Sequence, residues 1–186
     1  MNTSTNETSI DNESVLLDIK SLRKHARHNI ENGAVTKGYS ADRKEVIRLL
    51  NEALATELIC VLRYKRHYFM AKGIHSEPVK NEFLAHANEE MLHADRLAKR
   101  IVQLGGEPNF SPDGLSERSH AEYIEGDTLK AMIKEDLIAE RIAIESYQKI
   151  IAYMAEHDST TQIMLKDILA SEEEHADDLA SLLEGI

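Results

Sequence analysis

Two copies of a Glu-x-x-His motif, at residues 90–93 and 172–175, constrain this chain more than any other feature of its sequence. Residues three positions apart lie on one face of an α-helix, so the carboxylate and imidazole of each motif can reach one point. Apolar residues at steps of three and four flank the second motif, namely Leu165, Ile168, Leu179 and Leu182. Each motif is therefore expected on a buried face, where a charge is costly unless it is paired or bound to a metal. Two such motifs predict a metal site inside a helical bundle.

The pattern extends to a lone glutamate one helix before each motif. Glu57 precedes Glu90 by 33 residues (90 − 57), and Glu140 precedes Glu172 by 32 residues (172 − 140). The inward-facing set is then four carboxylates and two imidazoles: Glu57, Glu90, His93, Glu140, Glu172 and His175. Two divalent cations neutralise four carboxylates, and this donor set suits iron or manganese better than tetrahedral zinc.

Composition and helix-breaking residues predict the architecture that would hold this set. The 186 residues are 42% apolar and 30% charged, with three prolines and no tryptophan, a mixture that favours helices. We expect four long helices, at about residues 42–72, 76–104, 127–154 and 159 to near the C-terminus, with Ser76 capping the second. A connection of about twenty residues separates the second and third helices. The expected fold class is all-α, an antiparallel four-helix bundle with a long crossover.

The chain divides into an N-terminal extension, residues 1–40, and the bundle, residues 41–186. About the first fourteen residues are polar, which predicts disorder. Residues 15–28 form a short amphipathic piece that ends in a basic cluster. On a chain of net charge −11, this cluster is interpreted as a solvated helix or an assembly contact rather than as a DNA-binding tail.

Charge and cysteine content argue against several classes of protein. A net charge of −11 does not suit a dedicated nucleic-acid binder, which needs a cationic face. Cys60 is the only cysteine, so an intramolecular disulfide and a CxxC zinc or rubredoxin-type site are excluded. No apolar run approaches the ~18 residues of a membrane span, and the N-terminus has no apolar signal-like region. We expect a cytoplasmic protein without a membrane partner.

Four segments resemble the ferritin-like di-iron superfamily, specifically bacterioferritins and the bacterioferritin-related Dps-like proteins. They are NEALATEL (51–58), EEMLHADR (89–96), DLIAER (136–141) and EEEHADDL (172–179). In this superfamily a Glu from each of two helices joins a Glu-x-x-His from each of the other two. The resemblance implies a ferritin-like bundle with two iron ions per subunit. The resemblance implies that Glu57 and His93 bind the first ion. Glu140 and His175 would bind the second ion, and Glu90 and Glu172 would bridge the two ions.

The resemblance also implies a reaction and two further functional residues. The reaction is oxidation of Fe(II) by peroxide or O₂, for iron storage and protection from oxidative stress. Tyr64 matches a tyrosine near the bacterioferritin centre and is a candidate catalytic residue, with ordinary core packing as the alternative. Met91 matches the methionine that ligates haem across the bacterioferritin dimer axis, with simple packing as the alternative.

Three departures from the family pattern shape the expected assembly and chemistry. The sequence ends eleven residues after His175 (186 − 175), without the fifth short helix of bacterioferritins, so a dodecamer is expected in preference to a 24-mer or a dimer. Ile142 stands where Dps-like proteins carry a cysteine, so no thiol relay is expected. Ala85 stands where many bacterioferritins carry an inner-surface iron ligand. The neighbouring His86 and Glu89 are interpreted as a solvated helix face, with accessory iron sites as the alternative.

Two alternative functions stay open. The same ligand set serves manganese catalases and rubrerythrin-like peroxidases, although rubrerythrins usually add CxxC pairs that this chain lacks. The second alternative is a Dps-like protein that protects DNA by binding through residues 15–40. The cofactor also has alternatives. Manganese or zinc could replace iron, and haem could be bound in addition to iron.

Overall fold

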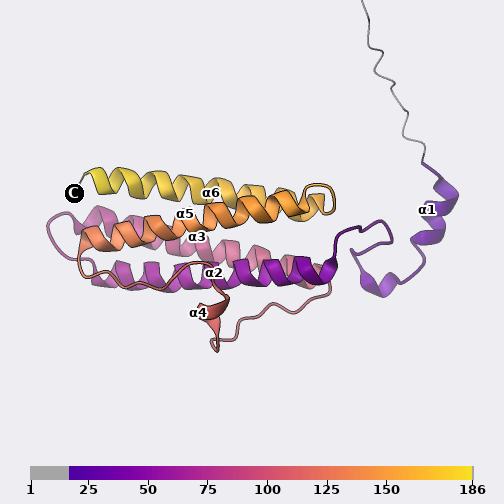
Figure 1. The fold of residues 1–186 in the computed structure, drawn as a ribbon, viewed down its shortest axis with the longest axis horizontal. Coiled ribbons are helices and arrows are strands. Elements are labelled where there is room, and N and C mark those ends of the chain that lie inside the picture. The colour runs from indigo at the N-terminus through magenta and orange to yellow at the C-terminus, as the bar shows by residue number, and fades with distance from the viewer. Residues whose placement is uncertain (1–16, 186) are drawn as a thin grey trace, which may run out of the picture.

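The computed structural model describes residues 17–185 and shows an all-α protein. The four long helices are α2 (Arg43–Met70), α3 (Ser76–Gln103), α5 (Leu129–Met154) and α6 (Ser159–Glu184). They pack mainly as the pairs α2 with α3 and α5 with α6, and Figure 1 shows the second pair lying over the first as a second layer. The predicted fold class, a ferritin-like antiparallel bundle with a long crossover, is confirmed. Within residues 17–185, no helix combines the length and apolar character needed to span a membrane.

Three shorter elements accompany the bundle in the described part of the chain: α1 (Ile19–His25), η1 (Ile30–Asn32) and α4 (Leu115–Arg118). Asp18 caps α1 by accepting hydrogen bonds from two backbone N–H groups of its first turn. The last turn of α1 holds Arg23, Lys24 and His25, which belong to the basic cluster expected from the sequence. The disorder predicted for about the first fourteen residues lies outside the described residues.

Side-chain caps set where three of the long helices begin. Asp42, Thr128 and Asp158 accept hydrogen bonds from first-turn amides of α2, α5 and α6. The prediction that Ser76 caps α3 is wrong. Ser76 is the first residue inside the helix, and its hydroxyl donates to the carbonyl oxygen of Gly73 (2.8 Å). Gly73 has a φ of 113°, which a glycine adopts without strain, and this turn brings its carbonyl within reach.

The crossover between α3 and α5 runs beside α2, and α4 packs on that helix (Figure 1). Near the start of α2, Asn51 Oδ1 accepts a hydrogen bond from the backbone N–H of Asn109 (2.7 Å). Near its end, Arg66 pairs with Glu125 (2.6 Å). Gly126 then turns the chain toward α5 with a φ of 61°, and a Cβ there would stand 2.9 Å from a backbone nitrogen of α5. The crossover thus carries the chain from one end of the bundle to the other.

Two apolar layers flank a polar belt midway along the bundle. The first layer includes Leu50, Leu97, Met154 and Leu165. The second layer includes Cys60, Phe83, Ile133 and Leu179. On each long helix, the predicted ligand positions fall between the residues of the two layers. The packing that stabilises the bundle therefore also seals the belt from bulk water.

A buried ionic network joins α2 to α5 and to the crossover. Arg63 Nε donates to Asp136 Oδ1 (2.7 Å), and His67 Nδ1 lies 2.8 Å from Asp136 Oδ2. Arg63 also donates to the carbonyl oxygen of Glu122 (2.9 Å), and His67 Nε2 bonds to that of Glu125 (2.9 Å). All three side chains of the network are 1% exposed or less. The network therefore holds the N-terminal half of α5 and the crossover against α2.

At the opposite end, Asp158 holds three parts of the chain together. Besides capping α6, its carboxylate accepts hydrogen bonds from Arg100 of α3 (2.8 Å) and from the hydroxyl of Tyr39 (2.9 Å). The bond to Tyr39 attaches the segment before α2 to the bundle. Burial acts to raise the pKa of Asp158, but hydrogen bonds from Thr161 and Tyr39 and the charge of Arg100 outweigh it and lower the pKa.

This lowered pKa predicts a defined pH dependence of stability. A carboxyl whose pKa is lower in the folded chain adds stability above its unfolded pKa of ~3.9, and this stability is lost as pH falls through the folded pKa. We expect the free energy of unfolding of wild type to exceed that of Asp158→Asn most at neutral pH, with the difference shrinking below about pH 4. Urea unfolding of chelator-treated protein across this range measures the difference. A difference that stays constant would contradict the prediction.

Candidate metal centre

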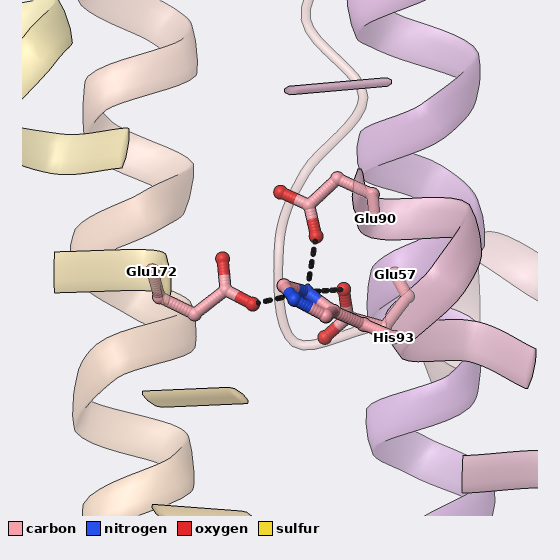
Figure 2. A group of neighbouring side chains, drawn as sticks. All are labelled: Glu57, Glu90, His93 and Glu172. Atoms are coloured by element: carbon pink, nitrogen blue, oxygen red, sulfur yellow. Dashed lines mark hydrogen bonds and ion pairs between the residues drawn. The ribbon is translucent and has the colours of Figure 1, made fainter. Parts of the chain in front are cut away.

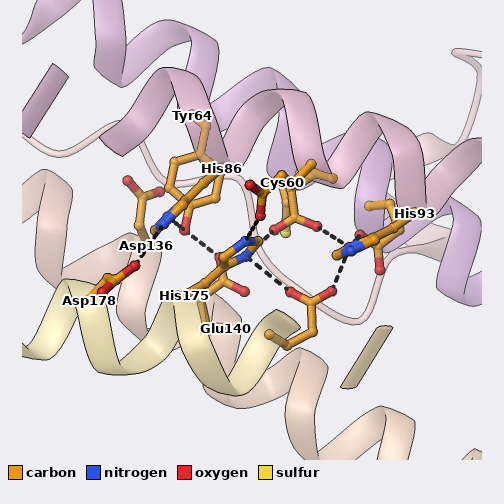
Figure 3. A network of polar contacts seen from close by, with 12 residues as sticks. Cys60, Tyr64, His86, His93, Asp136, Glu140, His175 and Asp178 are labelled. Carbon is orange, nitrogen blue, oxygen red and sulfur yellow. Dashed lines mark hydrogen bonds and ion pairs between the residues drawn. The ribbon is translucent and has the colours of Figure 1, made fainter. Parts of the chain in front are cut away.

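All six predicted ligands lie in the polar belt. α2 contributes Glu57 and α5 contributes Glu140, while the two Glu-x-x-His motifs belong to α3 and α6. Each of the six residues is at most 4% exposed. Because the glutamate and the histidine of a motif are one helical turn apart, both point from the same face into the space between the helices (Figures 2 and 3).

The six side chains form two groups of four that share two glutamates. The first group is Glu57, Glu90, His93 and Glu172, and the second is Glu90, Glu140, Glu172 and His175. Within each group, one ligand atom per residue lies within 4.8 Å of the others. His93 Nδ1 is 2.9 Å from Glu172 and 3.3 Å from Glu90 (Figure 2). His175 Nδ1 is 3.4 Å from Glu90 and 3.6 Å from Glu172. Each shared glutamate therefore faces both imidazoles, as a bridging carboxylate would.

The hydrogen bonding of these side chains fits a pair of cations. Among the described residues, seven buried side-chain nitrogen or oxygen atoms have no hydrogen-bond partner, and six of them belong to the two groups. Those six are Glu57 Oε2, Glu90 Oε1, Glu140 Oε2, both carboxylate oxygens of Glu172, and His175 Nδ1. Leaving so many buried polar atoms unpaired is costly, and coordination of cations would satisfy them. Carboxylate oxygens with one imidazole nitrogen in each group suit Fe(II) or Mn(II).

Protons offset the carboxylate charge in the belt. Burial raises the pKa of Glu57 to about 8, with the charge of Glu90 adding to the effect, and burial raises the pKa of Glu140 well above its usual range. Burial acts to lower the pKa of His93 and of His175, but the glutamate carboxylates that face each ring at ion-pair distance outweigh it and raise both pKa values to about 12. A cation has to displace these protons, so its affinity is expected to rise with pH.

Two tyrosines orient the outer glutamates in a symmetric way. Tyr64 on α2 donates a hydrogen bond to Glu140 on α5, and Tyr147 on α5 donates one to Glu57 on α2. Burial and the neighbouring carboxylates raise the pKa of both phenols well above its usual value, so both keep their protons and act as donors. Tyr64 was predicted from the sequence as a functional residue, and Tyr147 was not. Each tyrosine lies seven residues after the lone glutamate of its own helix (64 − 57 and 147 − 140), and this spacing was the available signal.

The interpretation of His86 as part of a solvated face is wrong, because the residue is only 2% exposed. It stacks on the ring of His175, with 4.1 Å between ring centroids, and its Nδ1 lies 3.3 Å from the hydroxyl of Tyr64 (Figure 3). Glu89, which is half exposed, reaches His175 Nε2 at 2.7 Å. A ligating histidine commonly donates its second ring nitrogen to a carboxylate in this way, which fixes the orientation of the ring.

Three other residues considered from the sequence lie outside the belt. Met91 is 39% exposed on α3 and belongs to neither group of potential ligands. Cys60 is buried, and its sulfur accepts a long hydrogen bond from Arg63 (3.6 Å). Ile142 packs against the second apolar layer. Cys60 is the chain's only thiol, so a relay through a cysteine pair is excluded.

Comparison with known proteins agrees with this geometry. The family model for ferritins, described as a ferritin-like domain, matches residues 47–186. The chain belongs to the ferritin-like family. Among ferritin-like relatives, the bacterioferritin of Mycobacterium avium is 33% identical over 141 residues, which cover 75% of this chain and 84% of that protein. The bacterioferritin of Streptomyces coelicolor is 32% identical over 143 residues, which cover 76% and 81%.

Solved structures of ferritin-like proteins give the same result. The bacterioferritin-related protein of Bacteroides fragilis, described as a dodecameric thioferritin, superposes with a TM-score of 0.76 at 33% identity, covering 78% of this chain and 88% of that one. Dps from Staphylococcus aureus superposes with a TM-score of 0.73 at 21% identity, covering 77% and 97%. At that identity, the likeness to Dps shows the shared ferritin-like fold alone.

Proposed function

We propose that this ferritin-like protein is a ferroxidase, which oxidises Fe(II) with peroxide or O₂ for iron storage and protection from oxidative stress. The observation that supports the proposal most strongly is the pair of buried ligand groups, with six polar atoms that coordination of cations would satisfy. Membership of the family that includes bacterioferritins supports the same reaction.

The ligands would divide between the two ions as the side chains divide between the two groups. Glu57 and His93 would hold the first ion. Glu140 and His175 would hold the second ion, and Glu90 and Glu172 would be shared by both ions. Once bound, the ions would supply one-electron exchange between Fe(II) and Fe(III). Oxidation of two Fe(II) ions releases two electrons, which with two protons reduce one peroxide to two water molecules.

The protein side chains contribute charge, orientation and exclusion of water. The four carboxylates offset the charge of two divalent ions. Because the belt is buried, bulk solvent screens the attraction between the carboxylates and the ions less than it would at the surface. Tyr64 and Tyr147 hold the carboxylates of Glu140 and Glu57 in place by hydrogen bonds, so their proposed role is positioning. Glu89 orients the ring of His175 from the solvent side.

An assembled shell of identical chains is part of the proposal. A single chain exposes large apolar side chains on α2 and α3, including Leu62, Phe69, Met70 and Leu92. Exposed apolar side chains of this kind are typical of contact surfaces. The related protein of Bacteroides fragilis is a dodecamer, and we propose the same state here, to be measured by light scattering on the purified protein.

Met91 is also partly exposed, and a Soret band would reveal haem bound there.

A comparison of oxidants and activities tests the proposed reaction. Protein loaded with Fe(II) without oxygen is mixed with O₂ or with peroxide, and formation of Fe(III) is followed by its absorbance. We expect fast oxidation at two Fe(II) per chain with at least one of the two oxidants. Manganese-loaded protein assayed for catalase serves as the control for the main rival function. Fast peroxide breakdown by the manganese form, with no accelerated Fe(II) oxidation, would overturn the proposal in favour of a catalase.

A further inference from the structure

A second cluster of metal-type side chains lies beside the belt, next to His175. It consists of Glu82 and His86 on α3 and Asp178 on α6, and one ligand atom from each lies within 4.8 Å of the others. None of these three residues belongs to the six ligands of the belt. We propose that they form a third divalent-cation site, distinct from the dinuclear centre.

The distances in this cluster suit a cation better than direct hydrogen bonds. His86 Nε2 lies 3.9 Å from Glu82 Oε2 and 3.7 Å from Asp178 Oδ2. Both separations exceed hydrogen-bond distance. When two ligand atoms each lie about 2.0–2.2 Å from one ion, the distance between the two ligand atoms is similar to these separations. Figure 3 shows Asp178 pointing from α6 toward the ring of His86.

The orientation of His86 is fixed by packing and points to a ligand. The residue is 98% buried (2% exposed), and its ring lies between His175, which it stacks on, and Tyr64, which it meets edge-on with ring centroids 5.4 Å apart. Nδ1 faces the hydroxyl of Tyr64 at 3.3 Å, which leaves Nε2 directed between the two carboxylates. One ring nitrogen of His86 is thus engaged by a neighbouring side chain, and the other is free to coordinate. Metal-binding histidines have this arrangement.

Charge and exposure indicate the kind of ion. The two carboxylates offer a charge of −2, which one divalent cation neutralises, and the mixed nitrogen and oxygen donors suit Fe(II), Mn(II) or Zn(II). The side chains of Glu82 and Asp178 are 43% and 53% exposed, so water completes the coordination and the ion exchanges readily with solvent. A cation at this site is separated from the dinuclear centre by little more than the stacked rings of His86 and His175.

A binding comparison on the full chain tests the third site. Equilibrium dialysis against Mn²⁺ is carried out with wild type, with Glu82→Gln/Asp178→Asn, and with Asp95→Asn/Glu173→Gln as matched control. The control removes one exposed carboxylate from each of the same two helices, away from the cluster. We expect the first variant to bind one Mn²⁺ per chain fewer than both wild type and control. Equal binding by the two variants would overturn the proposal.

Diffraction distinguishes a specific site from loose surface binding. In wild-type crystals soaked in Mn²⁺, we expect an anomalous peak at coordination distance from His86 Nε2, Glu82 and Asp178. The absence of that peak would also overturn the proposal, even if dialysis showed a difference. Both readouts concern this site alone, since the dialysis variants leave all six belt ligands unchanged and the diffraction peak is assigned by its distance from His86, Glu82 and Asp178. They therefore give the same answer whether or not the dinuclear centre proves to be a ferroxidase.

Discussion

Replacing both shared glutamates, in Glu90→Gln/Glu172→Gln, is expected to slow Fe(II) oxidation by at least about 100-fold, since loss of even an outer-shell partner of a metal site commonly costs about 10–100-fold. Both residues belong to both groups of ligands, so the double variant damages both metal positions at once. It also removes two of the four carboxylate charges that would offset two divalent ions. Stopped-flow absorbance after mixing Fe(II)-loaded protein with the oxidant measures the rate.

The fold should survive this change, which separates a lost site from an unfolded chain. Glutamine has nearly the volume of glutamate, so the packing around the belt is preserved, although the change removes the negative charges that face His93 and His175. We expect the metal-free variant to keep its helical circular dichroism but to unfold at a lower temperature than wild type, because the two imidazoles lose opposite charges. Asp95→Asn/Glu173→Gln, which removes two exposed carboxylates from the same helices, should oxidise Fe(II) like wild type. An unchanged oxidation rate in Glu90→Gln/Glu172→Gln would contradict the assignment of the centre.

Replacing Asp136, in Asp136→Asn, is expected to lower the free energy of unfolding by about 3–5 kcal/mol, the typical result of removing one partner of a buried ion pair. The carboxylate receives hydrogen bonds from Arg63 at one oxygen and contacts His67 at the other, and no part of the network is exposed by more than 1%. Its loss leaves the guanidinium of Arg63 buried without an opposite charge. Urea unfolding of metal-free protein measures the change.

The exposed ion pair between Arg96 and Asp167 provides the matched control. Its nitrogen–oxygen distance of 2.6 Å is similar to that of the buried pair, but its side chains are 37% and 71% exposed. Solvent screens such a pair, so Asp167→Asn should change the free energy of unfolding by about 0–1 kcal/mol. If Asp136→Asn and Asp167→Asn had equal effects, the buried network would not be what holds the crossover against α2.

The buried cluster of six ligand-type side chains was predictable because its signal lies within single helices. The three-residue spacing in each Glu-x-x-His motif, and the place of Glu57 and Glu140 within apolar stripes, point to a common interior without knowledge of how the helices meet. The boundaries of the long helices followed from the same periodicity and from the glycines and prolines between them. Only the start of α3 was described wrongly, since the role of Ser76 depends on the turn at Gly73.

Features that depend on the register between helices were not predictable in this way. His86 was interpreted as part of a solvated face, yet it is buried by a stack on His175, which lies on another helix. Tyr147 was overlooked because a tyrosine in an apolar stripe is typical of core packing, and its partner Glu57 lies 90 residues away in sequence. Arg63 and Asp136 are separated by 73 residues, so their pairing emerges only once α2 and α5 are packed.

Anomalous diffraction at the iron edge, on crystals loaded with Fe(II) without oxygen, tests the central claim most directly. We expect two iron peaks within the polar belt, each at coordination distance from both Glu90 and Glu172. One peak should also contact Glu57 and His93, and the other Glu140 and His175. A single peak in the belt, or none at iron concentrations that saturate the protein, would contradict the assignment of a dinuclear iron centre.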